Sequence, residues 1–338
     1  MVEVQHNVSL KNFNSFGIQA FAKYFVEINT EEQLSQLFSN SEIVKNPILI
    51  LGGGSNMLFT QNFDGLVIKI NIKGITHKVE ENKVLLTAGA GEVWNDLVIY
   101  VVSNNFAGLE NLSLIPGSVG ASPIQNIGAY GVELKDVFES CTAFEIETHK
   151  IRTFLKADCA FAYRESIFKQ ALKGKYIITS VTFNLKLMAN LNTQYGAISQ
   201  ELHNQNIQNP TIKNISDVVS QIRVSKLPNP STIGNAGSFF KNPIVTKDEA
   251  NQLIKNYPQV VNFNVGANHV KLAAGWLIEQ CGFKGLVVGN TGTYKNQALV
   301  LVNYGNATGL EIYNFSSQII ETVQQKFGVT LEREVNII

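Results

Sequence analysis

The segment Gly108–Gly131 constrains the fold more than any other part of the chain. It is dense in Gly, Pro, Ser and Asn, and it carries neither a helical period nor the alternation of a strand. A loop of this length is uncommon inside a compact domain and usually serves binding. Its small side chains let the backbone lie flat against a bound group. We therefore expect this segment to form part of a binding site.

A second glycine turn lies earlier in the chain, at Gly52–Asn56. It follows the apolar run Pro47–Leu51, which is typical of a buried strand entering a tight loop. Glycines let backbone N–H groups approach an anion, and Ser55 and Asn56 add side-chain donors, so a pyrophosphate would fit. Taken alone, the turn is as well explained as an ordinary strand end. Two separated glycine loops in one half of the chain favour a large anionic cofactor.

Two common nucleotide-binding motifs are absent. Gly52–Asn56 lacks the third glycine of the Rossmann fingerprint, and no strong helix follows it at once. The same holds for Gly89-Ala90-Gly91. No P-loop sequence occurs either. A dinucleotide cofactor would therefore be held in another kind of fold.

Strand and helix signals alternate along 338 residues, a length that suggests two or three domains. Capping-box sequences begin at Thr30, Thr246 and Thr308, and the last predicts a long helix that ends at Gly328. The polar stretch Ser199–Asn214 could hold a domain boundary. The expected class is α+β. Further predicted strands are Leu66–Ile70, Val84–Ala88, Val137–Glu147, Tyr176–Leu187 and Val329–Ile338; further predicted helices are Glu92–Asn104, Ile215–Ser225 and Leu272–Cys281.

Composition excludes several classes of protein. Lys+Arg and Asp+Glu both total 27, so there is no basic excess of the kind that non-specific nucleic-acid binding requires. No apolar stretch approaches the roughly 20 residues of a membrane span, and the N-terminus does not resemble a signal peptide. Cys141, Cys159 and Cys281 are far apart, which argues against disulfides or a zinc site. We expect a cytoplasmic protein with buried thiols and no metal.

The chain resembles the UDP-N-acetylenolpyruvoylglucosamine reductases, in the type that carries an extra inserted loop. The longest matching strings are Leu114–Gly131 and Asn235–Pro243. The resemblance implies a two-part FAD-binding domain of the vanillyl-alcohol-oxidase type and a separate α/β substrate-binding domain. The first part of the FAD-binding domain is implied to cover 1–70, with the C-terminal strand 329–338 returning to it. The second part covers 71–214 and holds the inserted loop near 190–200. The substrate-binding domain covers 215–328.

The resemblance also implies an activity, which is reduction of UDP-N-acetylenolpyruvoylglucosamine to UDP-N-acetylmuramate. NADPH would reduce bound FAD, and the flavin would pass hydride to the enolpyruvyl group. This reaction belongs to peptidoglycan precursor synthesis, and so to cell-wall biogenesis, cell shape and cell division. No partner beyond the substrate and NADPH is implied, and a monomer is expected.

Three residues match the catalytic positions of the family. Ser238 would donate the proton that completes the reduction, although most loop serines are structural. Arg164 would bind the substrate carboxylate, although a surface ion pair is the simpler interpretation of a lone arginine. Glu334 would hydrogen-bond the enolic intermediate, and Glu332 is its weaker rival. Asn336 replaces the usual arginine after Glu-Val, and the family's longer tail is missing, which puts the local support of Glu334 in doubt.

Binding residues are carried over in the same way. No His or Cys lies in the glycine loops, so the flavin is expected to be non-covalent. Phe263 stands where better-known relatives have a tyrosine, which suggests stacking alone. Phe239, Phe240 and Trp276 are expected in the core. The residues expected to contact FAD are Gly52, Gly53, Gly54, Ser55, Asn56, Gly117, Ser118, Gly120, Ala121, Ser122, Ile124, Asn126 and Gly128; those expected to contact substrate are Tyr195, Lys226, Asn242, Gln297 and Phe263.

Two alternatives stay open from the residues themselves. A flavin oxidase of the same fold would keep the glycine loops, but it would have no use for the combination of Ser238, Arg164 and Glu334. A non-catalytic nucleotide-sugar or flavin-binding protein would also keep the loops, but it would have no use for the proton donor. A bleaching of flavin colour by NADPH would distinguish the reductase from the binding protein.

Overall fold

The structure is a computed structural model that describes residues 2–39 and 42–338. Contacts divide the chain into two compact units. Both units mix helices and strands, so the predicted α+β class is confirmed. The three-part division expected from the sequence stays a prediction. Unit 1 comprises the chain up to Val8, Ala22–Gly53 and Phe63–Val224; unit 2 comprises Ser9–Phe21, Gly54–Asn62 and Ser225–Ile338.

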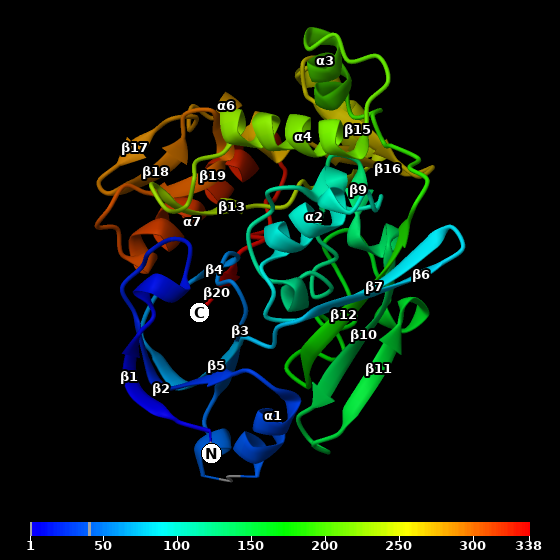
Figure 1. The fold of residues 1–338 in the computed structure, drawn as a ribbon. Coiled ribbons are helices and arrows are strands. Elements are labelled where there is room, and N and C mark those ends of the chain that lie inside the picture. The colour runs from blue at the N-terminus through cyan, green and yellow to red at the C-terminus, as the bar shows by residue number, and fades with distance from the viewer. Residues whose placement is uncertain (1, 40–41) are drawn as a thin grey trace. The chain divides into compact units, whose positions relative to one another are not determined.

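The described residues of unit 1 form two larger sheets and a short two-stranded ribbon (Figure 1). In the first, β3 and β2 flank β5 and both run parallel to it. The second sheet is antiparallel throughout. The first is ordered β1 (Gln5–Ser9), β2 (Phe21–Ile28), β5 (Phe63–Ile70), β3 (Ile48–Leu51); the second β11 (Ile151–Leu155), β10 (Phe138–Glu145), β12 (Tyr176–Lys186), β7 (Lys83–Gly89), β6 (Ile75–Glu80). The strands predicted over these segments are confirmed.

Helices α1 (Glu31–Phe38) and α2 (Trp94–Ser103) bury apolar faces in the core of unit 1. The Thr30 hydroxyl accepts from the Gln33 N–H, as the capping box predicts. In α2, Trp94 is fully buried, and its indole N–H donates to the Leu112 carbonyl at 3.0 Å. This bond ties the start of α2 to the glycine-rich segment.

The segment Gly108–Gly131 is mostly turns, as expected. Its regular structure is limited to short 3-10 turns and part of a two-stranded ribbon. These elements are η3 (Glu110–Leu112), η4 (Val119–Ala121) and β8 (Gly128–Ala129), which pairs with β9 (Val132–Glu133).

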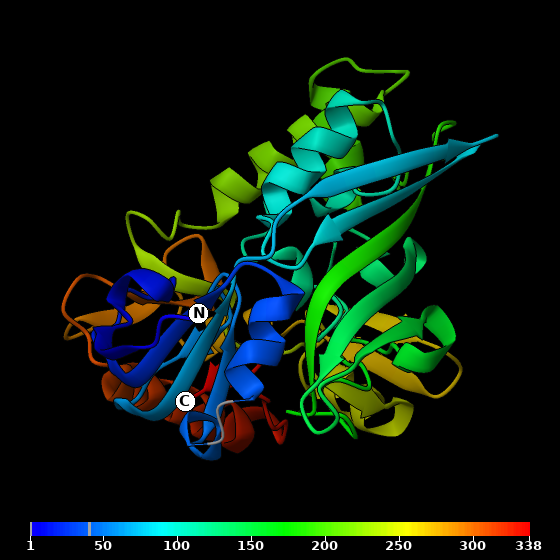
Figure 2. The ribbon, with the colours of Figure 1, turned by 60° about the horizontal axis from the view of Figure 1, so that its bottom comes forward.

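A second, smaller core lies between α3 (Gly196–Asn204) and α4 (Ile212–Lys226), both visible in Figures 1 and 2. Tyr130 and Leu191 pack against its edge. The helix predicted from Ile215 begins earlier than expected. Much of the polar stretch Ser199–Asn214, which the sequence analysis considered as a domain boundary, is helical. Ile198 and Leu202 give α3 an apolar face, and α4 covers that face. The buried residues of this core are Ile198, Leu202, Ile215, Val218, Val219 and Ile222.

Among the described residues, unit 2 contains two larger sheets, the two-stranded pair of β20 (Asn336–Ile337) with β4 (Met57–Leu58), and three α-helices. The capping boxes at Thr246 and Thr308 are both formed. Gly328 ends α7 in the left-handed conformation, as predicted. The sheets are ordered β13 (Gly234–Ser238), β19 (Gln297–Asn303), β18 (Thr291–Tyr294), β17 (Val287–Val288), and β14 (Ile244–Thr246), β16 (His269–Leu272), β15 (Asn262–Val265); the helices are α5 (Lys247–Asn256), α6 (Ala274–Gln280) and α7 (Gly309–Phe327).

Three local expectations in unit 2 are wrong. Val329–Ile338 is not a continuous strand: β20 (Asn336–Ile337) pairs in parallel with β4 (Met57–Leu58), and Arg333 forms a separate antiparallel bridge with Phe240. The helix predicted from Leu272 begins at Ala274, because Leu272 ends β16. Trp276 and Cys281 are half-buried rather than core residues. Phe239 and Phe240, in contrast, are buried as expected.

Among the helices of the described residues, none combines the length and the apolar character needed to cross a bilayer.

Candidate active site

The two glycine loops touch each other within unit 1. A Cβ built on Gly53 would lie 2.7 Å from the Gly117 Cα, and one built on Gly52 would lie 2.3 Å from the Ser118 Oγ. At Gly52 the atom met is the Ser118 hydroxyl, which can rotate aside, whereas at Gly53 it is backbone, so no side chain fits at Gly53. Glycine is therefore required here because two backbone segments, distant in sequence, pack directly on each other.

The Gly89–Gly91 turn joins the same group. The Gly120 N–H donates to the Ala90 carbonyl at 2.9 Å. A Cβ on Gly120 would lie 2.5 Å from the Ala90 Cβ. Three glycine turns thus form one continuous backbone surface in unit 1, of the kind that suits close approach by an anion.

Two lysines donate hydrogen bonds to backbone carbonyls of these glycine turns. Lys69 donates its ammonium to the Gly52 carbonyl, and Lys73 donates to the Gly91 carbonyl. Burial lowers the pKa of Lys69; Glu27 opposes that effect and the charge of Lys73 adds to it. Lys73 also forms an ion pair with Glu92 at 3.6 Å, so the charge of Lys69 is the one that most favours a negatively charged ligand at the turns.

Three residues expected at the cofactor also contact the turn that carries Arg164. Asn126 is fully buried, and its amide donates to the Ala162 carbonyl at 3.0 Å. The Ile124 carbonyl accepts from the Ser166 hydroxyl at 2.6 Å, and the Gly128 carbonyl accepts from Arg164 Nη2 at 2.8 Å. The glycine-rich segment therefore supports the turn that carries Arg164.

Arg164 has an uncommon backbone conformation for a residue with a side chain. Its φ is 57°, in the left-handed region, within a turn closed by the Ala162–Glu165 bridge. Its guanidinium lies 5.5 Å from the Tyr163 ring centroid. Such conformations cost about 1–3 kcal/mol and are concentrated at functional sites.

Arg223 and Tyr130 complete a basic cluster that the sequence analysis missed. Arg223 hydrogen-bonds the Tyr130 hydroxyl, and its Nε donates to the Leu114 carbonyl at 3.2 Å. Burial is the main cause that lowers the pKa of Arg223; Tyr130 opposes it, and the charge of Arg164 acts in the same direction as burial. Two guanidinium groups near enough to repel each other favour an anionic ligand. No motif or spacing connects these residues in the sequence.

Tyr195 lies against the same cluster. Its ring packs edge-on against Tyr130, with 5.3 Å between centroids, and 47% of its surface is exposed. Burial is the main cause that raises the pKa of Tyr130, which keeps the phenol protonated near neutral pH. The predicted substrate residues Arg164 and Tyr195 are thus brought together in unit 1 through Tyr130 and Arg223.

In unit 2 the structure brings Ser238 and Glu334 together. Ser238 is exposed at the end of β13, opposite Val300. The backbone N–H of Glu334 donates to the carbonyl of Phe239 at 2.8 Å. The carboxylate-bearing residue is therefore anchored beside the residue that follows Ser238.

Hydrogen bonds to Asn56 also hold the C-terminal segment that carries Glu334. The Asn56 amide donates to the Glu334 carbonyl at 3.3 Å, and the Asn336 amide donates to the Asn56 carbonyl at 2.9 Å. The rival Glu332 forms an ion pair with Lys241. Asn336 therefore fastens this segment without the arginine that the resemblance implies.

The other predicted substrate residues lie in two settings. Asn242 Oδ1 accepts from the Ala274 N–H at 2.9 Å, and a Cβ on Gly275 would lie 2.9 Å from Gln297 Oε1, so both amides meet at the start of α6. Phe263 on β15 is 55% exposed, and Lys226 is exposed as the last residue of α4.

Within residues 2–39 and 42–338, no three His, Cys, Asp or Glu side chains cluster as metal ligands do.

Comparison with known proteins identifies the chain. Residues 22–150 match the family model of an FAD binding domain, and residues 229–338 match that of the UDP-N-acetylenolpyruvoylglucosamine reductase C-terminal domain. A UDP-N-acetylenolpyruvoylglucosamine reductase from Flavobacterium johnsoniae is 51% identical over 339 residues, which is 100% of both chains. The chain belongs to the UDP-N-acetylenolpyruvoylglucosamine reductase family.

Further relatives agree with this assignment. The Amoebophilus asiaticus UDP-N-acetylenolpyruvoylglucosamine reductase is 48% identical and covers all of both chains. The crystal structure of the Thermus caldophilus reductase has a TM-score of 0.68 at 23% identity, covering 100% of this chain and 99% of that one. The fold is therefore that of this reductase family, with an FAD-type domain at residues 22–150 that contains all three glycine turns.

Proposed function

We propose that this protein reduces UDP-N-acetylenolpyruvoylglucosamine to UDP-N-acetylmuramate, with NADPH as electron donor and FAD as bound cofactor. The observation that carries the proposal is 51% identity, over the whole of both chains, to a reductase of that name. The product serves peptidoglycan synthesis, and hence cell shape and division. We further propose that the protein acts in the cytoplasm as a monomer, and that it has the three-part division of domains given by the sequence.

The described residues of unit 1 fit the diphosphate of FAD. Glycine turns at Gly52–Gly53, Gly89–Gly91 and Gly117–Gly120 give a surface of backbone and small side chains, and Lys69 and Lys73 supply positive charge. Ser118 and the continuing residues Gly54–Asn56 would add donors, and no His or Cys in these turns offers a covalent attachment. When bound, FAD accepts electrons from NADPH and delivers hydride to the enolpyruvyl group.

Arg164 binds the enolpyruvyl carboxylate in this proposal, and Arg223 adds a second positive charge. Hydride addition places negative charge next to that carboxylate, so a fixed guanidinium stabilises the transition state more than the ground state. The supporting observation is that Arg164 is held by the Gly128 carbonyl and by a left-handed turn.

Ser238 donates the proton to the carbanion-like carbon, and Glu334 hydrogen-bonds the enolic intermediate. A hydroxyl is neutral and compact, and it can protonate a strongly basic carbon when held in place. The backbone bond from Glu334 to Phe239 supports a joint role, since it fixes the two residues in one local arrangement. The ion pair of Glu332 with Lys241 supports Glu334 as the acting carboxylate.

The remaining polar and aromatic residues bind the nucleotide sugar. Lys226 neutralises diphosphate charge, Asn242 and Gln297 offer amides, Phe263 stacks, and Tyr195 closes over the ligand. Support comes from the exposure of Tyr195, Phe263 and Lys226, which leaves each of them accessible to a ligand.

A flavin absorbance experiment tests the proposal. NADPH should bleach the 450 nm band of the purified yellow protein under anaerobic conditions, and the UDP-enolpyruvyl sugar should restore it. Bleaching followed by recovery only with O₂, with peroxide released, would identify an oxidase instead. Absence of bleaching would leave a binding protein.

A further inference from the structure

One buried amide joins two loops in unit 1 that carry tyrosines. Asn111, on η3, has 1% of its surface exposed. Its Nδ2 donates to the Tyr130 carbonyl at 3.1 Å and to the Asn192 carbonyl at 2.9 Å. A single side chain therefore connects the turn that carries Tyr130 to residues 188–195, which we call the Tyr195 segment.

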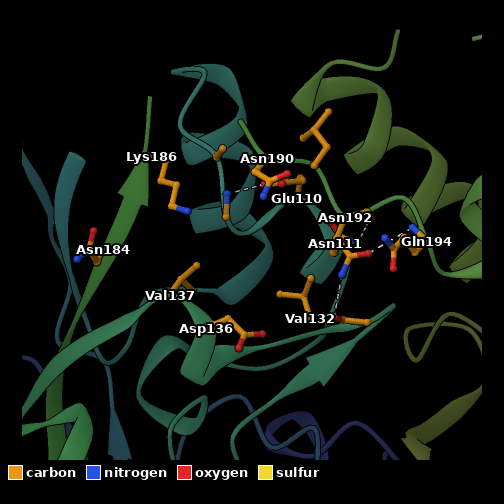
Figure 3. A pocket seen from close by; sticks show the side chains of 14 residues that line it. Glu110, Asn111, Val132, Asp136, Val137, Asn184, Lys186, Asn190, Asn192 and Gln194 are labelled. Atoms are coloured by element: carbon orange, nitrogen blue, oxygen red, sulfur yellow. Dashed lines mark hydrogen bonds between the residues drawn. The ribbon is translucent and has the colours of Figure 1, made fainter. Parts of the chain in front are cut away.

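The side chain of Asn192 also forms hydrogen bonds, one of them back to the turn that carries Tyr130. Asn192 Nδ2 donates to the Gly131 carbonyl at 3.0 Å, and its Oδ1 accepts from the Gln194 N–H at 3.3 Å. The two asparagines thus form a pair of crossed links, which we call the Asn111–Asn192 clasp. Figure 3 shows both side chains together along one wall of a cavity, with their hydrogen bonds drawn.

The clasp has little packing to assist it on the cavity side. The cavity measures about 390 Å³, and Asn111, Asn192 and Gln194 line it on one side, while Asn184 and Lys186 line it on the other (Figure 3). Side chains that face open space make few dispersion contacts. Within the Tyr195 segment, Met188, Asn190 and Gln194 are exposed. Leu191 also restrains the segment by packing against the α3–α4 core, and the Thr193 carbonyl accepts from the Ser199 hydroxyl. The clasp is the link that joins the segment to the turn carrying Tyr130.

The clasp also fixes the aromatic pair. Tyr195 lies three residues after Asn192, whose side chain donates to the Gly131 carbonyl. The ring centroids of Tyr195 and Tyr130 are 5.3 Å apart. Tyr130 in turn hydrogen-bonds Arg223, which lies near Arg164. A shift of the Tyr195 segment would thus separate Tyr195 from the basic cluster.

We propose that Asn111 and Asn192 are positioning residues that set substrate affinity by holding Tyr195 in place. Neither touches the reacting atoms. The proposal rests on the proposed function, in which Tyr195 contacts the nucleotide sugar. It goes beyond that function because it assigns the position of Tyr195 beside Tyr130 to the Asn111–Asn192 clasp.

Two variants break the clasp in different ways. Asn111→Leu removes both buried donations at similar volume. Asn192→Asp keeps the oxygen that accepts from Gln194 but loses the donation to Gly131. Asn184→Leu is the matched control, since Asn184 lines the same cavity but donates to Glu139 on the sheet. If Asn111→Leu fails to fold, Asn192→Asp alone decides.

Two readouts are needed. Steady-state kinetics should show the KM for the UDP-enolpyruvyl sugar raised about 10-fold, because each hydrogen bond of this kind is worth up to a factor of about ten. Flavin content and the rate of reduction by NADPH should stay within about 2-fold of wild type. Thermolysin, which cleaves before residues such as Leu187, Met188 and Leu191, should cut the Tyr195 segment at least about 5-fold faster. The control should change neither.

The outcomes separate this proposal from the proposed function. Unchanged cleavage and unchanged KM in both variants would overturn the clasp. A parallel fall of flavin content and melting temperature in Asn111→Leu, with Asn192→Asp normal, would also overturn it, since Asn111 would then be purely structural. If wild-type protein fails to turn over the sugar nucleotide, the proposed function fails, and the cleavage rates still decide whether the clasp holds the segment.

Discussion

The Glu334 N–H and the Phe239 carbonyl oxygen lie 2.8 Å apart, and this hydrogen bond fixes Glu334 beside the strand end that carries Ser238. The two residues are almost one hundred positions apart in the sequence. The bond belongs to a short antiparallel contact in which Phe240 pairs with Arg333 and the Lys241 N–H donates to the Glu332 carbonyl. The proposed acid Ser238 and the proposed carboxylate Glu334 are therefore held close together by backbone pairing.

Glu334→Gln should slow the reduction of the enolpyruvyl sugar while leaving flavin reduction by NADPH close to normal. Gln keeps the size of the side chain but changes its hydrogen-bonding to the developing enolate, a loss we expect to cost on the order of 10²-fold. Stopped-flow absorbance of each half-reaction measures this directly. Glu332→Gln is the control, because Glu332 is 71% exposed at its side chain and paired with Lys241. Equal losses in the two variants would remove the special role of Glu334.

Asn336→Leu should weaken the same half-reaction more mildly. The change removes the donation to the Asn56 carbonyl but leaves the β20–β4 backbone pairing intact. An exposed hydrogen bond of this type is worth about 0.5–1.5 kcal/mol, so a 2- to 10-fold effect on substrate turnover is expected. Asn336→Arg, which restores the family's residue, should retain activity. A complete loss with Asn336→Arg would mean that the asparagine has a role specific to this chain.

Gly53→Ala should weaken flavin binding. Its Cβ would meet the Gly117 Cα at 2.7 Å, and backbone cannot rotate away as a side chain can, so the two glycine turns must separate. Overpacking of this kind costs about 1–3 kcal/mol, which corresponds to a roughly 10- to 100-fold weaker FAD Kd. The ratio of 450 to 280 nm absorbance after purification, and FAD titration of the apoprotein, measure it. Gly196→Ala, which meets nothing within 4 Å, should bind flavin normally.

Strands, capped helices and glycine turns were predictable because each depends on neighbours in the sequence. Thr308 and Gly328 set the ends of α7 by local hydrogen bonds and backbone conformation. The contact of Gly53 with Gly117, the bond from Arg223 to Tyr130 and the Asn111–Asn192 clasp were not predictable. Each joins segments whose meeting depends on the whole fold. The roles of Ser238 and Arg164 came from resemblance, since a lone serine or arginine carries no local signature.

The partial exposure of Trp276 and Cys281 was also not predictable from the sequence, because it depends on what the whole fold places over α6. Their apolar character predicts burial, but α6 is only seven residues long, and part of its surface is left uncovered. Cys281 should therefore be the first cysteine alkylated by iodoacetamide in the native protein, because Cys141 and Cys159 are buried. Burial raises the pKa of the Cys281 thiol, so its reaction should be slower than that of a free thiol at pH 8 and should accelerate as the pH rises. Peptide mass spectrometry follows the order of labelling, and prior labelling of Cys141 would contradict the packing.

Ser238→Ala should separate the two half-reactions most sharply. Reduction of FAD by NADPH needs no proton from Ser238 and should proceed at close to its normal rate. Reduction of the enolpyruvyl group ends with protonation of a carbanion-like carbon, and alanine has no proton to give. Loss of a general acid typically costs about 10²–10⁴ in rate, or about 3–5 kcal/mol of barrier.

Ser238→Cys is the matching test of the same role. A thiol can also donate a proton, so this variant should recover part of the lost rate, whereas a serine needed only for packing would be replaced as well by alanine as by cysteine. Ser238 is exposed at the end of β13, so neither substitution opens a cavity in the core, and the melting temperature should stay within a few degrees of wild type. Single-turnover absorbance, started from the reduced enzyme, measures the rate. Equal slowing of both half-reactions in Ser238→Ala would assign the serine to the fold, and an unchanged second half-reaction would leave the proton to come from another group.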